Sequence, residues 1–156
     1  MGLVDRIIQR AQRTPYFHLQ GYMNRWWLVP YIGAGSKTDI GCGPVSWRRP
    51  IAKLLQLFGI AVRVHEILRS DADHHPHDHP WWFITIILRG GYIETLYNDK
   101  GRVKDVNYWG PGTILFRRAT SWHRLTLPEK TPTWTLFISG PYQHTWGFNV
   151  NGKKVP

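Results

Sequence analysis

The pattern of hydrophobic and polar positions changes character near residue 60. Before that point, apolar residues recur at helical spacing over residues 2–13 and 51–58, and Pro15 and Gly59 are typical terminators after them. After it, apolar residues fall in short runs separated by Gly, Pro, Asn and Asp, which is typical of strands joined by tight turns. The pattern therefore predicts two short helices followed by an all-β region.

The all-β region contains several predicted strands. They cover residues 60–68, 82–88, 92–97, 102–108, 113–117, 121–127 and 133–139. Residues 98–101 and 110–112 have the composition of turns. An aromatic stretch over 22–31, which forms a strand or a lid on the core, and a Gly-rich loop over 33–43 precede them. Short strands with frequent turns predict a sandwich or a barrel.

The length and composition agree with one folded domain. The chain has 156 residues and a mass of 18.2 kDa, and 42% of its residues are hydrophobic. We expect one domain over 1–156, with residues 1–59 packed as an extension on a barrel formed by residues 60–145. The lone Cys42 cannot form an internal disulfide. Without an apolar run of roughly 20 residues or a secretory signal, we expect a cytoplasmic protein with no membrane partner.

The charge balance is strongly basic. Lys and Arg number 20 against 10 Asp and Glu, which gives a formal net charge of +10. Such an excess suggests an anionic partner, and nucleic acid is one candidate. The basic residues are scattered, however, and no nucleic-acid-binding motif accompanies them. Nucleic acid is therefore a partner that we do not favour.

Histidines are concentrated in the segment DADHHPHDHPWW, residues 71–82. In an extended chain successive side chains alternate, so His75, His77 and His79 would point one way and His74 and Asp78 the other. Two imidazoles that are two residues apart can bind the same metal ion, and imidazole suits iron, zinc, copper and nickel. The pairs 75/77 and 77/79 both have this spacing.

This segment resembles the first sequence motif of the cupin superfamily. In that motif a His-x-His pair is followed by three or four residues, an acidic ligand, six residues and a glycine. Here His77 and His79 are followed by three residues, Phe83, six residues and Gly90. The position of the acidic ligand thus holds a phenylalanine, and the spacing to Gly90 favours His77 and His79 over His75.

A later segment resembles the second cupin motif, which reads Gly, five residues, Pro-x-Gly, two residues and His. Here Gly112 is followed by five residues, Arg118-Ala119-Thr120, two residues and His123. The resemblance covers roughly residues 60–145 and implies an all-β, cupin-type jelly-roll β-barrel. It also implies a divalent metal ion held in the barrel by His123 and the two histidines of the first motif.

The set of three histidines resembles the thiol dioxygenase branch of the superfamily, of which cysteine dioxygenase is typical. The stretch HDHPWWFITIILRGGYIETLY is similar to the first motif of that branch, and His123-Arg124-Leu125 to its second. The branch implies mononuclear non-haem Fe(II) bound by His77, His79 and His123, and zinc and nickel are the other candidates. Three neutral ligands would leave coordination positions open for a substrate and O₂.

The predicted substrate contacts are residues that would face the barrel interior. Arg63 could bind a carboxylate or phosphate of a small polar substrate in bidentate fashion. Phe83 and Thr85 would alternate inward with the histidines. The Ser-His-Tyr relay of thiol dioxygenases falls on Thr135, Phe137 and Ser139 here, so its His and Tyr are absent. Thr135 and Phe137 are still predicted substrate contacts. No catalytic residue is assigned.

Three functional hypotheses follow. The first is a mononuclear Fe(II) dioxygenase-like enzyme. The second is a non-catalytic, phage-encoded metal-binding or interaction module, because the Ser-His-Tyr relay is lost and the net charge is +10. The segments ILRSDADHHPHDHPWWF, TIILRGGYIE and TWTLFISGPYQHTWGF are similar to small cupin-like proteins of bacteriophages and prophages. The third is a basic nucleic-acid-binding protein. The sequence also leaves open a homodimer and the replacement of one ligand by His75.

Overall fold

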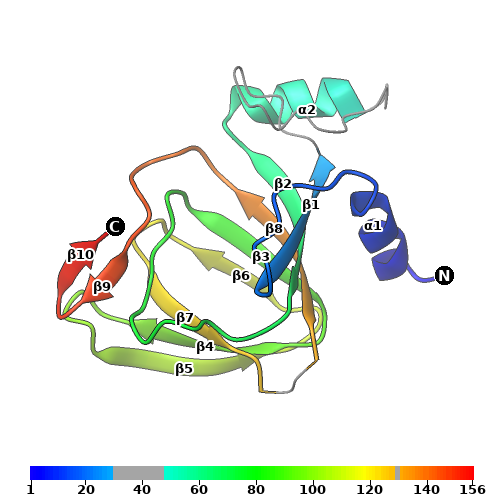
Figure 1. Ribbon diagram of the computed structural model, residues 1–156. Helices are drawn as coiled ribbons and strands as arrows, with labels where there is room; N and C mark the ends of the chain where they lie inside the picture. The colour runs from blue at the N-terminus through cyan, green and yellow to red at the C-terminus, as the bar shows by residue number, and fades with distance from the viewer. Residues whose placement is uncertain (30–47, 129–130) are drawn as a thin grey trace.

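The computed structural model describes residues 1–29, 48–128 and 131–156 and consists mainly of antiparallel sheets (Figure 1). One sheet has five strands in the order β1-β2-β8-β3-β6, a second has three in the order β5-β4-β7, and β9 and β10 form a separate hairpin. The strands are β1 (Met23–Val29), β2 (Ala61–Ile67), β3 (Phe83–Arg89), β4 (Tyr92–Tyr97), β5 (Val103–Trp109), β6 (Ile114–Arg117), β7 (Trp122–Thr126), β8 (Thr133–Ser139), β9 (Phe148–Val150) and β10 (Lys153–Val155).

All the predicted strands are present, to within one residue at each end. Both predicted helices are also present, as α1 (Leu3–Ala11) and α2 (Arg48–Leu57). The aromatic stretch contributes β1, an edge strand of the five-stranded sheet. The hairpin of β9 and β10 was not predicted. The Gly-rich loop over 33–43, which includes Cys42, lies outside the described residues.

Helix α1 covers part of the outer face of the five-stranded sheet (Figure 1). Its buried residues Ile8 and Ala11 pack against Trp26 of β1 and Val64 of β2. At its N-terminus, the Asp5 carboxylate accepts a hydrogen bond from the Gly2 N–H at 3.1 Å. The amphipathic pattern of residues 2–13 therefore has a direct structural cause, because one side of the helix is buried on the sheet.

A hydrophobic core joins the two larger sheets. It is formed by Ile67, Ile87, Tyr92, Leu115 and Leu125, which come from β2, β3, β4, β6 and β7. Strand alternation then determines which other side chains point inward, because residues of one face recur at every second position. The resulting row of inward residues forms the cavity described below.

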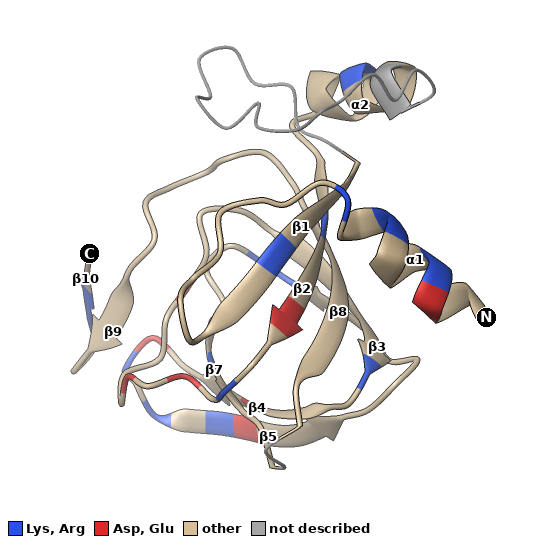
Figure 2. Cartoon of the chain, turned by 45° about the vertical axis from the view of Figure 1, so that its right-hand side comes forward, with Lys and Arg blue, Asp and Glu red and all other residues tan. Residues whose placement is uncertain are grey.

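Basic residues are distributed over the molecule. Figure 2 shows Lys and Arg on both helices and on strands of both larger sheets. Within the described ranges, no helix combines the length and apolar character needed to cross a bilayer. The two chain ends lie far apart, with the N-terminus beside α1 and the C-terminus in the hairpin (Figure 1).

Candidate metal centre

The histidine-rich segment is an extended loop whose backbone is fixed by neighbouring strands. His77 and His123 exchange two backbone N–H···O hydrogen bonds, each 3.0 Å long. The His79 N–H donates to the Ala119 carbonyl at 3.2 Å. These bonds hold the segment in strand-like geometry beside β7, so that residues 77 and 79 point to one side and Asp78 to the other.

Three imidazoles converge at this point. Their ligand nitrogens, from His77, His79 and His123, all lie within 4.8 Å of one another. The Nε2 atoms of His79 and His123 are 2.9 Å apart. The donor set and its spacing fit one divalent ion of the kind that imidazole prefers. His75 is exposed and lies outside this group.

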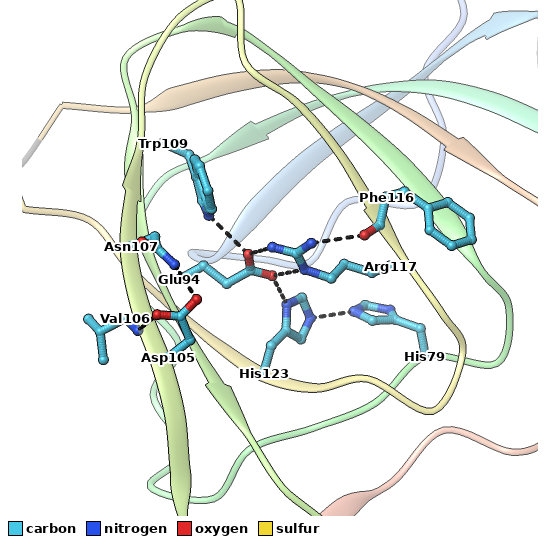
Figure 3. Close-up of polar contacts among 9 residues, drawn as sticks. All are labelled: His79, Glu94, Asp105, Val106, Asn107, Trp109, Phe116, Arg117 and His123. Carbon is cyan, nitrogen blue, oxygen red and sulfur yellow. Dashed lines mark hydrogen bonds and ion pairs between the residues drawn. The ribbon is translucent and has the colours of Figure 1, made fainter.

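A buried carboxylate orients one of the three imidazoles (Figure 3). Glu94 Oε1 lies 2.8 Å from His123 Nδ1, and the Glu94 side chain is 2% exposed. Arg117 Nε and Trp109 Nε1 each donate to the same carboxylate at 3.0 Å. Because an ionised carboxylate only accepts, Nδ1 of His123 carries the proton and its Nε2 lone pair faces the other histidines.

The ionisation of Glu94 follows from these contacts. Burial raises the pKa of Glu94, but the hydrogen bonds from His123 and Arg117 outweigh it and lower the pKa to about 2. The carboxylate therefore stays charged at neutral pH. Its charge is balanced by Arg117, whose guanidinium makes a second, very short contact with it.

The other two imidazoles are held in the neutral form. Burial, reinforced by His123, lowers the pKa of His77 to about 4. The same causes, with the nearby His77, lower the pKa of His79 well below 6.5. Asp71 Oδ2 lies 3.7 Å from His77 Nδ1. Neutral imidazoles with available lone pairs are the form that binds metal.

Asp78 has a structural role on the opposite side of the segment. Its carboxylate accepts the Gly147 N–H at 2.9 Å and the Lys154 ammonium at 2.5 Å. Lys154 belongs to β10 and Gly147 immediately precedes β9. The unpredicted C-terminal hairpin is therefore attached to the residue between two of the converging histidines.

A cavity of about 590 Å³ opens beside the three imidazoles. The residues predicted from the sequence as substrate contacts all line it, namely Arg63, Phe83, Thr85, Thr135 and Phe137. Phe83 occupies the acidic-ligand position of the cupin motif. Its ring centre lies 4.7 Å from that of His79, and its ring stacks on Phe137 at 5.0 Å. This side of the cluster is therefore aromatic.

Several residues of the site could not be identified from motif spacing. Glu94 and Arg117 are charged residues at strand positions whose side chains point into the barrel. A charge at such a position is the one signal in the sequence that could have identified them. Trp146 and Phe148 also line the cavity, and their rings are 4.5 Å apart. Their segment follows the last predicted strand, so the strand pattern provided no reason to place them there.

Comparison with known proteins supports the fold. No protein-family model and no curated protein matches the chain. The polyketide cyclase RemF from Streptomyces resistomycificus superposes with a TM-score of 0.57 and 14% identity, over 90% of this chain and 82% of the cyclase. A single-residue variant of the oxalate decarboxylase of Bacillus subtilis gives a TM-score of 0.53 and 12% identity, over 84% of this chain and 28% of the decarboxylase.

A cupin superfamily protein from Desulfitobacterium hafniense DCB-2 is also similar, with a TM-score of 0.41 and 13% identity over 53% of this chain and 67% of that one. The antiparallel sheets, together with the superpositions on the cyclase and the decarboxylase, show that the chain has a cupin-type jelly-roll fold. At identities this low the likeness concerns the fold alone, and any reaction has to be argued from the site.

Proposed function

We propose that this protein is a metal-dependent cupin enzyme that holds one divalent ion, Fe(II), through His77, His79 and His123. In this proposal it acts as a dioxygenase on a small substrate. The observation that carries the proposal is the convergence of three imidazoles, with ligand nitrogens within 4.8 Å, on the wall of a cavity of about 590 Å³.

The donor set supports a catalytic rather than a structural ion. Structural sites are usually closed by four protein ligands, whereas catalytic sites keep positions open. Here Phe83 stands where the cupin motif places an acidic ligand, so only histidines converge. An Fe(II) ion bound there would supply Lewis acidity and O₂ activation at those open positions.

The protein residues around the cluster would position the substrate and the ligands. Glu94 fixes the tautomer and orientation of His123. The rings of Phe83 and Phe137 exclude water from the side next to His79. Thr85 and Thr135, both buried, offer hydroxyl groups from the cavity wall.

Metal uptake under anaerobic Fe(II) loading, measured by elemental analysis, tests the ligand set. We expect about one ion per chain in the wild type and its loss in His77→Ala and in His123→Ala. His75→Ala is the matched control, because His75 lies in the same loop but is exposed, and it should keep the metal. Equal metal content in all four proteins would reject the proposed ligands.

Oxygen consumption tests the reaction class. Iron-loaded protein is monitored with an oxygen electrode in the presence of thiols, diketones and catechols, and His123→Ala serves as the inactive control. Retained iron with no O₂ uptake for any of these substrates would reject the dioxygenase and favour a non-catalytic metal-binding module.

A second candidate is acid–base chemistry without O₂, supported by zinc or nickel. Its basis is His65, which lines the cavity and stacks on Phe137 at 4.7 Å. Its Nε2 has no hydrogen-bond partner in the described part of the chain, and burial keeps the imidazole neutral by lowering its pKa well below 6.5. Turnover by the zinc form under anaerobic conditions would favour this candidate over the dioxygenase.

A further inference from the structure

Arg63 is a buried cation without an acidic partner in the described ranges. Its side chain lies in the cavity wall at 4% exposure, and one guanidinium nitrogen donates to Ser139 Oγ at 2.8 Å. Its Nε has no hydrogen-bond partner, and no carboxylate pairs with Arg63 among the residues that the structure describes. A buried charge normally requires a counter-charge, because desolvation without one is costly.

A second arginine reaches the same end of the cavity. Arg25 of β1 lies opposite His65 in the sheet register, and its Nε donates to the Phe17 carbonyl at 2.7 Å. Both guanidinium carbons lie against the ring of Tyr16, that of Arg25 at 4.8 Å and that of Arg63 at 5.7 Å from its centre. Arg25 also forms no ion pair within the described part of the chain, so the two cations share one unneutralised region.

The wall between these arginines and the three imidazoles is aromatic. The Arg63 guanidinium lies 5.2 Å from the ring centre of Trp81 and 5.3 Å from that of Phe137. The Phe137 ring is in turn 6.4 Å from the ring of His79. A molecule that extends from the arginines to the histidines would therefore contact rings along its length.

We propose that Arg25 and Arg63 form an oxyanion subsite, and that the cavity binds organic carboxylates or phosphate monoesters with an apolar body the size of a ring. Guanidinium groups suit both oxyanions because their N–H donors match the oxygen geometry. The inference deepens the proposed function and rests on it, since it names the substrate class of the same site. It disfavours small polar thiols such as cysteine, which would leave the aromatic wall uncovered.

Isothermal titration calorimetry with benzoate and phenyl phosphate tests the subsite. Benzamide serves as the neutral analogue of benzoate, and acetate and inorganic phosphate serve as anions without a ring. We expect both ring-bearing anions to bind. Benzamide should bind at least about tenfold weaker because hydrogen bonds to charged groups are stronger than those to neutral ones. Acetate and inorganic phosphate should also bind at least about tenfold weaker, because without a ring they leave the aromatic wall uncovered. The tighter of the two ring-bearing anions identifies the anionic group.

Three variants locate the binding. Arg25→Gln and Arg63→Gln should each raise the dissociation constant at least about tenfold. Arg69→Gln is the matched control, because Arg69 lines the same cavity but its guanidinium already donates to the carbonyls of Gly21 and Ser70, both at 3.1 Å. It should change the constant less than about twofold. If Arg63→Gln does not fold, the less buried Arg25 decides the question.

The same titrations on metal-loaded and metal-free protein separate this inference from the proposed function. Equal affinity for benzamide and benzoate, or unchanged anion binding in the arginine variants, overturns the inference. Anion binding that needs the metal but not the arginines overturns it as well and leaves the proposed function intact. Arginine-dependent binding by a protein that takes up no metal upholds it and rejects the metal enzyme.

Discussion

At the scale of single residues, His123 depends on a carboxylate from another strand. Glu94 lies on β4 and His123 on β7, and the two side chains meet diagonally across that strand pair. Arg117 and Trp109 in turn hold Glu94. The orientation of one metal-facing nitrogen is therefore determined by a network of four side chains from four strands.

We predict that Glu94→Gln lowers metal affinity about 10- to 100-fold, as is typical when a partner of a metal-binding histidine is changed. The amide can still accept from Nδ1, but it lacks the charge that makes His123 a stronger ligand and that neutralises Arg117. Competition with a metal chelator measures the affinity. Asp105→Asn is the control, because Asp105 is exposed on β5, and it should leave the affinity unchanged.

Alternation predicted some of these residues and could not predict others. A period of two was sufficient to predict that residues 77 and 79 share one side, and that Phe83 and Thr85 point inward with them. It could not predict that Glu94 meets His123, because that contact depends on which strands become neighbours. Arg25 was missed for a related reason, since the surrounding segment reads equally well as a strand or a lid.

At the scale of secondary structure elements, the inward faces of the sheets carry the stability. Most of the strands from β2 to β8 were predictable because apolar residues recur between turn residues. Strand β5, with the sequence VKDVNYW, was predictable only as the strand that pairs back on β4 after the turn at 98–101. Strands β9 and β10 have three residues each, which is too short for a periodic signal. They form because Asp78 and the backbone of the histidine loop provide partners, which is a tertiary effect.

We predict that Ile87→Ala destabilises the protein by about 2–5 kcal/mol, because it leaves a cavity in the core between the two larger sheets. Ile87 is 1% exposed. Ile114→Ala is the matched control on the neighbouring strand β6, where the side chain is 68% exposed, and it should cost less than about 0.5 kcal/mol. Urea denaturation followed by fluorescence measures both. Equal losses in the free energy of unfolding in the two variants would show that the inward and outward faces of the sheet do not differ in burial.

The hairpin of β9 and β10 offers a second test at this scale. Lys154→Met removes the ammonium from the buried Asp78 carboxylate, and we expect a loss of about 1–3 kcal/mol in the free energy of unfolding. Lys153→Met is the control, because Lys153 is adjacent and exposed. Chemical denaturation of both variants measures the difference. If the two variants were equally stable, the contact between Lys154 and Asp78 would not hold the hairpin.

At the scale of the whole molecule, the charged groups divide into two populations. The excess of Lys and Arg is distributed over the helices and strands (Figure 2). The interior holds Glu94, Arg63, His65 and His123, which all lie at or beside the cavity that contains the proposed site. Buried imidazoles that stay neutral affect the stability of the entire fold, because the unfolded chain exposes them to protons.

The effect of proton binding on the stability of the fold can be measured at His65. Burial, together with the charges of Arg63 and Arg25, lowers its pKa well below the usual 6.5 in the folded protein. Below pH 6.5 the unfolded chain therefore binds a proton at His65 that the folded protein does not bind. At neutral pH, His65 is neutral in both states and the stability of the folded protein is not reduced by its protonation. As the pH falls from 6.5 toward the folded-state pKa of His65, the free energy of unfolding decreases, because only the unfolded chain binds the proton.

We predict that the free energy of unfolding of metal-free protein falls more steeply below pH 6.5 in the wild type than in His65→Leu, by up to about 1.4 kcal/mol per pH unit. Urea denaturation between neutral and mildly acidic pH, with EDTA present, measures both slopes. His77, His79 and His123 are present in both proteins, so the difference between the two slopes comes from the removal of His65. Parallel curves would mean that His65 is accessible to protons in the folded state, and its buried position in the cavity wall would be wrong.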